Sequence, residues 1–163
     1  MTANRKIKNA TPTEYDGIQF KSKTEVVVYK TLLQYGFKPY YEPTKYGVWR
    51  GFKPTVPAYK PDKTGQLKLE DKKIIDITYT PDFIFMAPDN KTVIIMEAKG
   101  GFLNDTYPIK EKLFRGYLEN LLKTVNQPTM FFQVRSKSQV IQAINIIKEK
   151  FKDEQPKKWI RIY

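Results

Sequence analysis

Three stretches of the chain carry apolar residues at the spacing of an amphipathic helix. They span residues 22–35, 108–125 and 138–151, and Gly36 directly follows the first, where a helix is expected to stop. The expected buried residues are Val26, Tyr29, Leu32 and Leu33 in the first helix, Leu113, Tyr117, Leu121 and Leu122 in the second, and Val140, Ile141, Ile144 and Ile147 in the third.

The remaining apolar runs are short and rich in β-branched and aromatic residues, which favours strands. Strands are predicted at residues 37–43, 74–86, 92–99 and 129–134, with 159–163 as a last strand that closes the sheet. A turn at residues 88–91 joins the second and third strands into a hairpin. This order of elements predicts one α/β domain over residues 1–163, with a mixed central sheet flanked by helices.

The amino-acid composition limits the catalytic and metal-binding groups that the protein can use. The 163-residue chain contains neither cysteine nor histidine, which excludes disulfides, thiolate or imidazole metal sites, and Ser-His-Asp hydrolysis. No apolar run is long enough for a membrane span and the amino terminus is polar, so we expect a cytoplasmic protein without a membrane partner. The formal charge of +12 favours a polyanionic partner, of which nucleic acid is the commonest.

The positive charge concentrates in two segments. Residues 1–15 are predicted to form a flexible basic arm, and residues 45–73 hold eight basic residues against three acidic ones. The second segment is either an insertion or an extended hairpin, and the sequence leaves open whether it follows a phosphate backbone. Candidate DNA contacts are Lys53, Lys60, Lys63 and Lys68 in this segment, and Lys110, Lys112 and Arg115 on the second helix, where a merely solvated face is the alternative.

The predicted hairpin brings three charged residues together. With the turn centred between residues 89 and 90, Asp82 lies opposite Glu97, with their Cβ atoms about 4.5–5.5 Å apart. Alternation along the strand places Lys99 on the same face as Glu97. Both faces of the hairpin are otherwise apolar, which is typical of strands covered on both sides.

Two carboxylates in such surroundings need a counter-charge, since at about 5 Å they repel by about 3 kcal/mol at an effective dielectric near 20. A divalent cation removes this repulsion, and hard oxygen ligands suit Mg²⁺ or Mn²⁺. The alternative interpretation is that Asp82 caps a turn and that Glu97 and Lys99 form a surface ion pair.

The charged residues of this hairpin also belong to a sequence pattern that resembles a known family. Pro81-Asp82 followed by Glu97-Ala98-Lys99 resembles the signature of the PD-(D/E)XK nucleases, and the flanking segments at 78–83 and 97–100 look like those of phage endonuclease I, a family of Holliday junction resolvases. Residues 20–25 and 36–42 resemble the superfamily's first helix and the strand after it. The resemblance covers about residues 17–125 except 45–73, and that segment is a departure which puts the substrate preference in doubt.

The resemblance implies a restriction-endonuclease-like fold and catalytic roles for Glu25, Asp82, Glu97 and Lys99. Asp82, Glu97 and the carbonyl of Ala98 would bind Mg²⁺ or Mn²⁺, and Glu25 would hold a second ion or a water on the metal. Glu25 has a second interpretation, because Ser22-Lys23-Thr24-Glu25 is also a capping box in which Glu25 bonds back to the Ser22 amide.

The function expected from these features is metal-dependent hydrolysis of DNA phosphodiester bonds, without a small-molecule cofactor, to leave 5′-phosphate and 3′-hydroxyl ends. The preferred substrate would be branched DNA, such as a Holliday junction, cut by a homodimer. The alternatives are a nicking or duplex endonuclease of phage replication or restriction type, and a catalytically inactive DNA-binding protein with the same fold.

Overall fold

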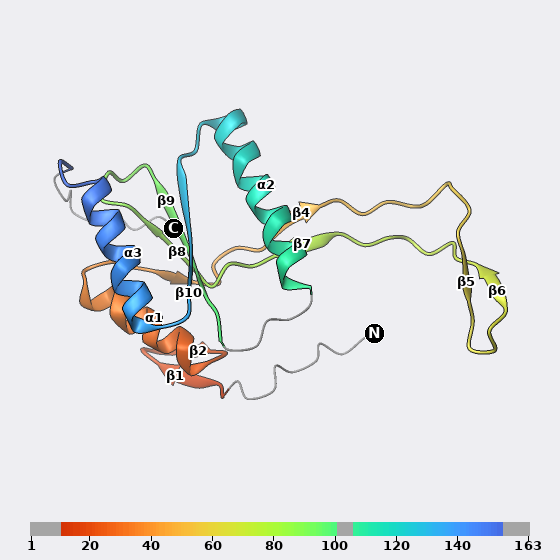
Figure 1. The fold of residues 1–163 in the computed structure, drawn as a ribbon, viewed down its shortest axis with the longest axis horizontal. Helices are drawn as coiled ribbons and strands as arrows, with labels where there is room; N and C mark the ends of the chain where they lie inside the picture. The colour runs from red at the N-terminus through yellow and green to blue at the C-terminus, as the bar shows by residue number, and fades with distance from the viewer. Residues whose placement is uncertain (1–10, 101–105, 155–163) are drawn as a thin grey trace.

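A four-stranded mixed sheet forms the centre of the computed structural model, which describes residues 11–100 and 106–154 (Figure 1). Its strand order is β10-β9-β8-β3, in which β9 and β10 are parallel and the other neighbours antiparallel. The strands are β3 (Tyr40–Tyr41), β8 (Phe83–Met86), β9 (Val93–Ala98) and β10 (Thr129–Val134). The predicted α/β class with a mixed sheet is confirmed.

Three helices cover the two faces of this sheet (Figure 1). Helices α1 (Lys23–Gln34) and α3 (Lys137–Lys150) pack on one face, and α2 (Tyr107–Val125) lies on the other. Helix α2 connects the parallel strands β9 and β10, which cannot be joined by a tight turn. All three helices lie where the apolar spacing predicted them.

Alternating residues of β8 and β9 face different cores. Phe83, Phe85 and Ile94 pack in the larger cluster with α1 and α3, whereas Ile95 packs with Phe114 of α2 in the smaller one. The prediction of strands covered on both faces is therefore confirmed.

The buried face of α2 differs from the predicted one. Phe114 is fully buried, while the predicted core residue Leu122 is 45% exposed and Leu113, Tyr117 and Leu121 are only half-buried. Helix α2 covers the sheet around its middle, and Leu122 lies near its carboxyl end, so the prediction for Leu122 was wrong.

A small hairpin precedes α1 and was not predicted. Strands β1 (Thr13–Tyr15) and β2 (Ile18–Phe20) pair across Asp16 and Gly17, whose φ angles of 56° and 73° suit a two-residue hairpin turn. The end of the predicted flexible arm at residues 13–15 is thus a strand, and residues 1–10 lie outside the described residues.

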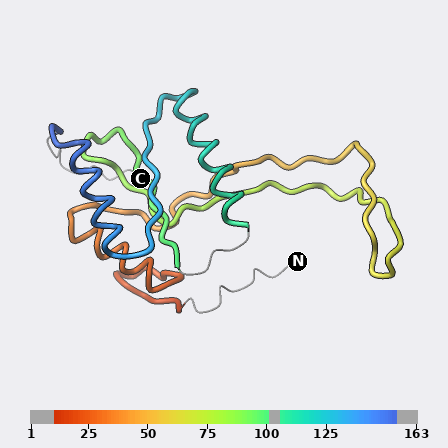
Figure 2. Tube along the Cα trace, in the orientation of Figure 1, coloured from red at the N-terminus to blue at the C-terminus, as the bar shows by residue number. Residues whose placement is uncertain are grey.

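Residues 45–73 form an extended hairpin that projects far from the sheet (Figures 1 and 2). Its base is the pair β4 (Tyr46–Trp49) and β7 (Ile77–Tyr79), and its tip is the pair β5 (Tyr59–Pro61) and β6 (Leu67–Leu69). We call residues 46–79 the projecting arm. The outgoing and returning segments of the arm approach each other closely at Gly51. A Cβ atom there would lie 2.1 Å from the carbonyl oxygen of Ile74, so only glycine fits.

The predicted strand 74–86 is interrupted. It divides into β7, which pairs with β4 in the arm, and β8, which pairs with β9 in the central sheet. Thr80, Pro81 and Asp82 lie between the two strands, and Pro81 has no N–H to offer to a sheet. The predicted strand 159–163 lies outside the described residues. Among the described helices, none has the length and apolar character required to cross a membrane.

Candidate active site at the ends of strands β8 and β9

The pairing of β8 with β9 brings Asp82 to Glu97. Phe83 pairs with Met96 and Ile84 with Ile95, which is the predicted register and leaves Asp82 opposite Glu97 at the next position. The backbone N–H of Ala98 donates to Oδ2 of Asp82 over 2.8 Å. This bond holds the carboxylate against β9 even though Asp82 lies just outside β8.

The buried Glu97 forms an ion pair with the partly buried Lys99. Nζ of Lys99 lies 2.8 Å from Oε2 of Glu97, and their side chains are 19% and 2% exposed. A surface ion pair, the alternative interpretation of these residues, is therefore wrong. The other carboxylate oxygen, Oε1 of Glu97, is buried and makes no hydrogen bond of ordinary geometry within the part of the chain that the structure describes, although the Tyr79 hydroxyl is a polar neighbour of Glu97.

The environment of Asp82 disfavours its charge. Burial raises the pKa of its carboxyl well above the usual value, and the negative charge of Glu97 raises it further, while Lys99 acts in the opposite direction. The charge of Glu25 also raises the pKa of Asp82, although by less. The four predicted catalytic residues therefore belong to one electrostatic neighbourhood.

Glu25 is buried and holds the start of α1 together. Its Oε2 accepts from the backbone N–H of Lys21 over 2.9 Å and from the hydroxyl of Tyr41 over 2.6 Å, and its Oε1 accepts from the Ser22 hydroxyl over 2.9 Å. The predicted bond to the Ser22 amide is replaced by the bond to the Lys21 amide, one residue earlier. The Ser22 hydroxyl also accepts from the Glu25 N–H, as a helix cap does. The capping interpretation of Glu25 thus holds in modified form.

The residues at this site fit a divalent cation, but as a pair of carboxylates and not as a larger cluster. Residues 11–100 and 106–154 contain no group of three or more acidic side chains arranged around one metal position. Asp82 and Glu97 nevertheless provide two adjacent hard oxygen donors, and the buried Oε1 of Glu97 makes no hydrogen bond of ordinary geometry among the described residues. A cation beside these two side chains would satisfy that oxygen and remove the repulsion that raises the pKa of Asp82.

Two tyrosines at the site were not identified from the sequence. Tyr79, from β7, is buried in a stack on Phe114 with ring centroids 4.3 Å apart, and the ring of Tyr107 lies 3.7 Å from Nζ of Lys99. Both hydroxyl groups are buried and have polar neighbours, which are Glu97 and Tyr107 for the Tyr79 hydroxyl and Tyr79 and Glu111 for the Tyr107 hydroxyl. Burial and the charge of Glu97 raise the pKa of both phenols, so both keep their protons. Nothing in the sequence pattern distinguishes them from core aromatics.

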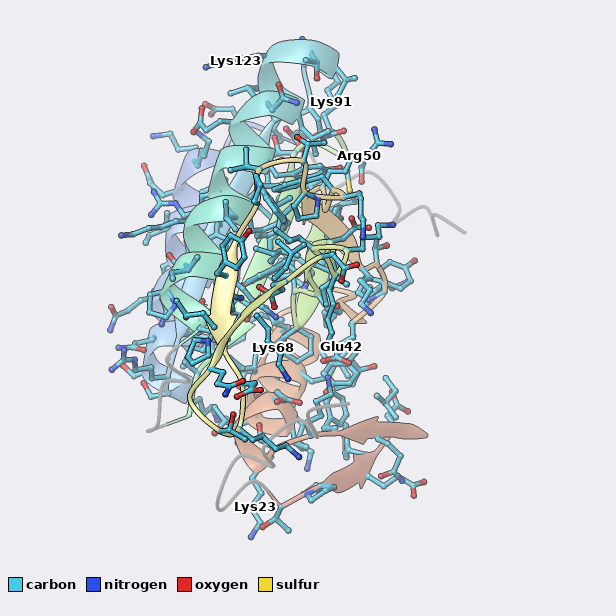
Figure 3. The ribbon with its side chains drawn as sticks, turned by 90° about the vertical axis from the view of Figure 1, so that its right-hand side faces the viewer. Lys23, Glu42, Arg50, Lys68, Lys91 and Lys123 are labelled. Carbon is cyan, nitrogen blue, oxygen red and sulfur yellow. The ribbon has the colours of Figure 1, made fainter. Side chains whose placement is uncertain are left out.

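The basic residues of the arm are largely engaged within the arm. Lys60 pairs with Glu70, Nζ of Lys68 lies 2.7 Å from Asp62, and Lys53 donates to the carbonyl of Asp71. Lys63 is exposed at the tip and takes part in no ion pair with another described residue. Figure 3 views the molecule from the end of the arm, with Lys68 labelled there and Lys123 labelled on α2. The lysines predicted to contact DNA are accessible, but three of the four also stabilise the arm.

The three basic residues predicted on α2 are each exposed. Lys110 and Lys112 follow Tyr107 within the first turns, and Arg115 lies 3.9 Å from Glu111 on the same helix. All three side chains are exposed to solvent, which agrees with the alternative of a merely solvated role.

Comparisons with known proteins give no relative for this chain: no family model, no curated protein and no solved structure matches it.

Proposed function

We propose that this protein is a metal-dependent endonuclease that hydrolyses DNA phosphodiester bonds, of the PD-(D/E)XK type that its motifs resemble. One observation carries the proposal: Glu97, 1% exposed, is paired with Lys99 directly opposite a desolvated Asp82. Holding three charges, one of them fully buried, at the ends of two apolar strands costs stability, and groups held at such a cost are concentrated at functional sites. Metal-assisted hydrolysis of a phosphodiester uses oxygen donors for the metal together with a cationic group that stabilises developing negative charge.

Asp82 and Glu97 are the proposed metal ligands, together with the carbonyl of Ala98. Mg²⁺ or Mn²⁺ bound by them would neutralise charge on the scissile phosphate and activate water. Glu25 is proposed to act at longer range, because its oxygens are occupied by Lys21, Ser22 and Tyr41. Its charge then strengthens the negative potential that attracts the cation.

Lys99 supplies the fixed positive charge of the site. Its ammonium group has three N–H donors, of which one is used by Glu97, so others are left for a phosphate oxygen or the attacking water. In the proposed reaction the water oxygen bonds to phosphorus and loses a proton to solvent, while the bond from phosphorus to the 3′ oxygen breaks and that oxygen takes up a proton from solvent. The products are a 5′-phosphate and a 3′-hydroxyl end. Lys99 would stabilise the negative charge that develops on the phosphate oxygens in the transition state.

DNA is the proposed substrate because of the charge of the chain and the position of the arm. A surplus of +12 attracts a polyanion, and the returning strand of the arm, β7, ends at Tyr79, three residues before Asp82. DNA held along the arm would thus extend toward the carboxylates. A projecting arm can touch a second duplex only where two helices lie close together, so we propose branched DNA as the preferred substrate and a homodimer as the active form.

The test is to incubate the protein and Mg²⁺ with three end-labelled DNAs: a four-way junction, one of its linear arms, and a single strand. The proposal expects cleavage within the duplex parts of the junction and slower cleavage of the linear arm. Equal rates on junction and linear arm would favour a nicking or duplex endonuclease instead. Binding of all three DNAs without cleavage would identify a DNA-binding protein that retains an idle site.

A further inference from the structure

The ammonium group of Lys99 has two neighbours that restrict it. Oε2 of Glu97 lies 2.8 Å away, and the centroid of the Tyr107 ring lies 3.7 Å away. Lysine has a flexible four-carbon side chain, and one carboxylate contact alone leaves that chain several rotamers. The face of an aromatic ring attracts the ammonium group and adds a second point of attachment.

Tyr107 is itself held firmly. It is half-buried at the start of α2, packs in the smaller core cluster and lies 6.5 Å from Tyr79 between ring centroids. Tyr79 in turn stacks on Phe114, which is fully buried in the same helix. The position of the Tyr107 ring is thus fixed by the packing of α2 on the sheet.

The hydroxyl of Tyr107 is buried near the Tyr79 hydroxyl and Glu111, whereas its ring faces the Lys99 ammonium group. The hydroxyl and the ring thus have different neighbours, and the contact with Lys99 depends on the ring alone.

We propose that Tyr107 is a positioning residue, whose ring holds the Lys99 ammonium group against Glu97 in the orientation that the reaction needs. This inference rests on the proposed nuclease function for its catalytic part, while the contact itself is a matter of geometry. It makes the first turn of α2 a part of the site, although Tyr107 touches no reacting atom.

The test uses two substitutions at this residue and one matched control. Tyr107→Phe keeps the ring and removes the hydroxyl, whereas Tyr107→Leu removes the ring. Tyr117→Leu removes another half-buried ring of the same helix, which contacts Tyr46 and not Lys99. Tyr107→Met replaces Tyr107→Leu if the leucine variant is poorly folded.

The first readout is the NMR signal of the Lys99 ε-methylene group, which needs no nuclease activity. A ring at this distance shifts that signal upfield, so we expect the shift in the wild type, Tyr107→Phe and Tyr117→Leu, and its loss in Tyr107→Leu. The absence of an upfield shift in the wild-type protein would overturn the proposal, whether or not the protein cuts DNA.

The second readout is the single-turnover cleavage rate beside the DNA dissociation constant. We expect Tyr107→Leu to cut about 5–30-fold more slowly, the range expected for a partly desolvated cation–π contact, with unchanged DNA affinity. Tyr107→Phe and Tyr117→Leu should keep the wild-type rate. Equal rates for Tyr107→Leu and Tyr107→Phe would contradict the positioning role. A wild-type protein that cuts no DNA would defeat the proposed function, and the NMR shift would still decide on the contact.

Discussion

The backbone N–H of Ala98 donates to Oδ2 of Asp82 over 2.8 Å, and this bond connects the carboxylate that precedes β8 to the strand that carries Glu97 and Lys99. It holds an acidic group beside another acidic group, an arrangement that the protein alone does not favour.

Replacing Asp82 with asparagine should stabilise the metal-free protein at neutral pH. Burial and Glu97 raise the pKa of Asp82 above its unfolded value of about 3.9, so folding favours the protonated form. Stability from this group is present at acid pH and lost as the pH rises through the folded pKa. We expect Asp82→Asn to raise Tm in EDTA at pH 7 by a few degrees, and the gain to vanish as the pH falls below 4. Thermal unfolding at several pH values measures it.

Asp89→Asn is the control for this experiment. Burial acts to raise the pKa of Asp89, but the hydrogen bonds from the hydroxyl and N–H of Thr92 outweigh it and lower that pKa. The charged form is therefore favoured by folding, and its removal should lower Tm at neutral pH. If Tm falls in both variants, the charged form of Asp82 does not destabilise the folded protein.

Glu25→Gln should reduce both stability and cleavage. Glutamine cannot accept all three hydrogen bonds that Glu25 accepts, which costs about 1–3 kcal/mol. If the charge of Glu25 also supports metal binding, the cleavage rate at a temperature well below Tm should fall about 10–100-fold. Guanidinium unfolding and single-turnover kinetics measure the two effects.

The matched variant is Tyr41→Phe, which removes one of the same hydrogen bonds and leaves the carboxylate charged. It should lose stability and keep its rate. If Glu25→Gln is as fast as Tyr41→Phe, Glu25 only caps the helix.

Neutralising Lys53, Lys60, Lys63 and Lys68 to glutamine should weaken junction binding more than binding to a linear duplex. Each phosphate contact that is lost should lower the salt dependence of binding by about 1. Because Lys60 and Lys68 have partners in the arm, Lys63 should account for more of the loss than either of them. Competition binding at several salt concentrations measures this. The same number of substitutions on α3 and just beyond it, at Lys137, Lys148, Lys150 and Lys152, keeps the net charge equal and should leave the preference intact.

Calcium should support DNA binding but not cleavage. The proposed ligands are all oxygens, which Ca²⁺ accepts with looser geometry and poorer activation of water. Band-shift and cleavage assays in Ca²⁺ and in Mg²⁺ would check this, and rapid cleavage in Ca²⁺ would contradict the proposed metal role.

The sequence predicted the parts of this fold that depend on local periodicity. Val26, Tyr29 and Leu32 mark the buried face of α1, and Ser22 and Gly36 bound it, so both packing and capping were visible in the pattern. The hairpin register followed from the turn at Asp89 and Asn90, and it placed Asp82 opposite Glu97 as observed.

The hairpin at Asp16-Gly17 was not predicted, although its turn has a local signal. Other features depend on contacts that the spacing of residues does not specify. The partners of Lys60 and Lys68 depend on the register of the arm tip, and the contact of Tyr107 with Lys99 depends on how α2 crosses the sheet. Spacing along the chain carries no information about either.

The most direct test of the central claim is single-turnover cleavage of a labelled four-way junction by the wild type, Asp82→Asn, Glu97→Gln and the exposed control Glu119→Gln, each in Mg²⁺ and in EDTA. The account predicts cleavage only in Mg²⁺, by the wild type and Glu119→Gln, while Asp82→Asn and Glu97→Gln bind the junction at least as tightly as the wild type and do not cut it. Cleavage by the wild type in EDTA, or near-normal cleavage by either carboxylate variant in Mg²⁺, would contradict it.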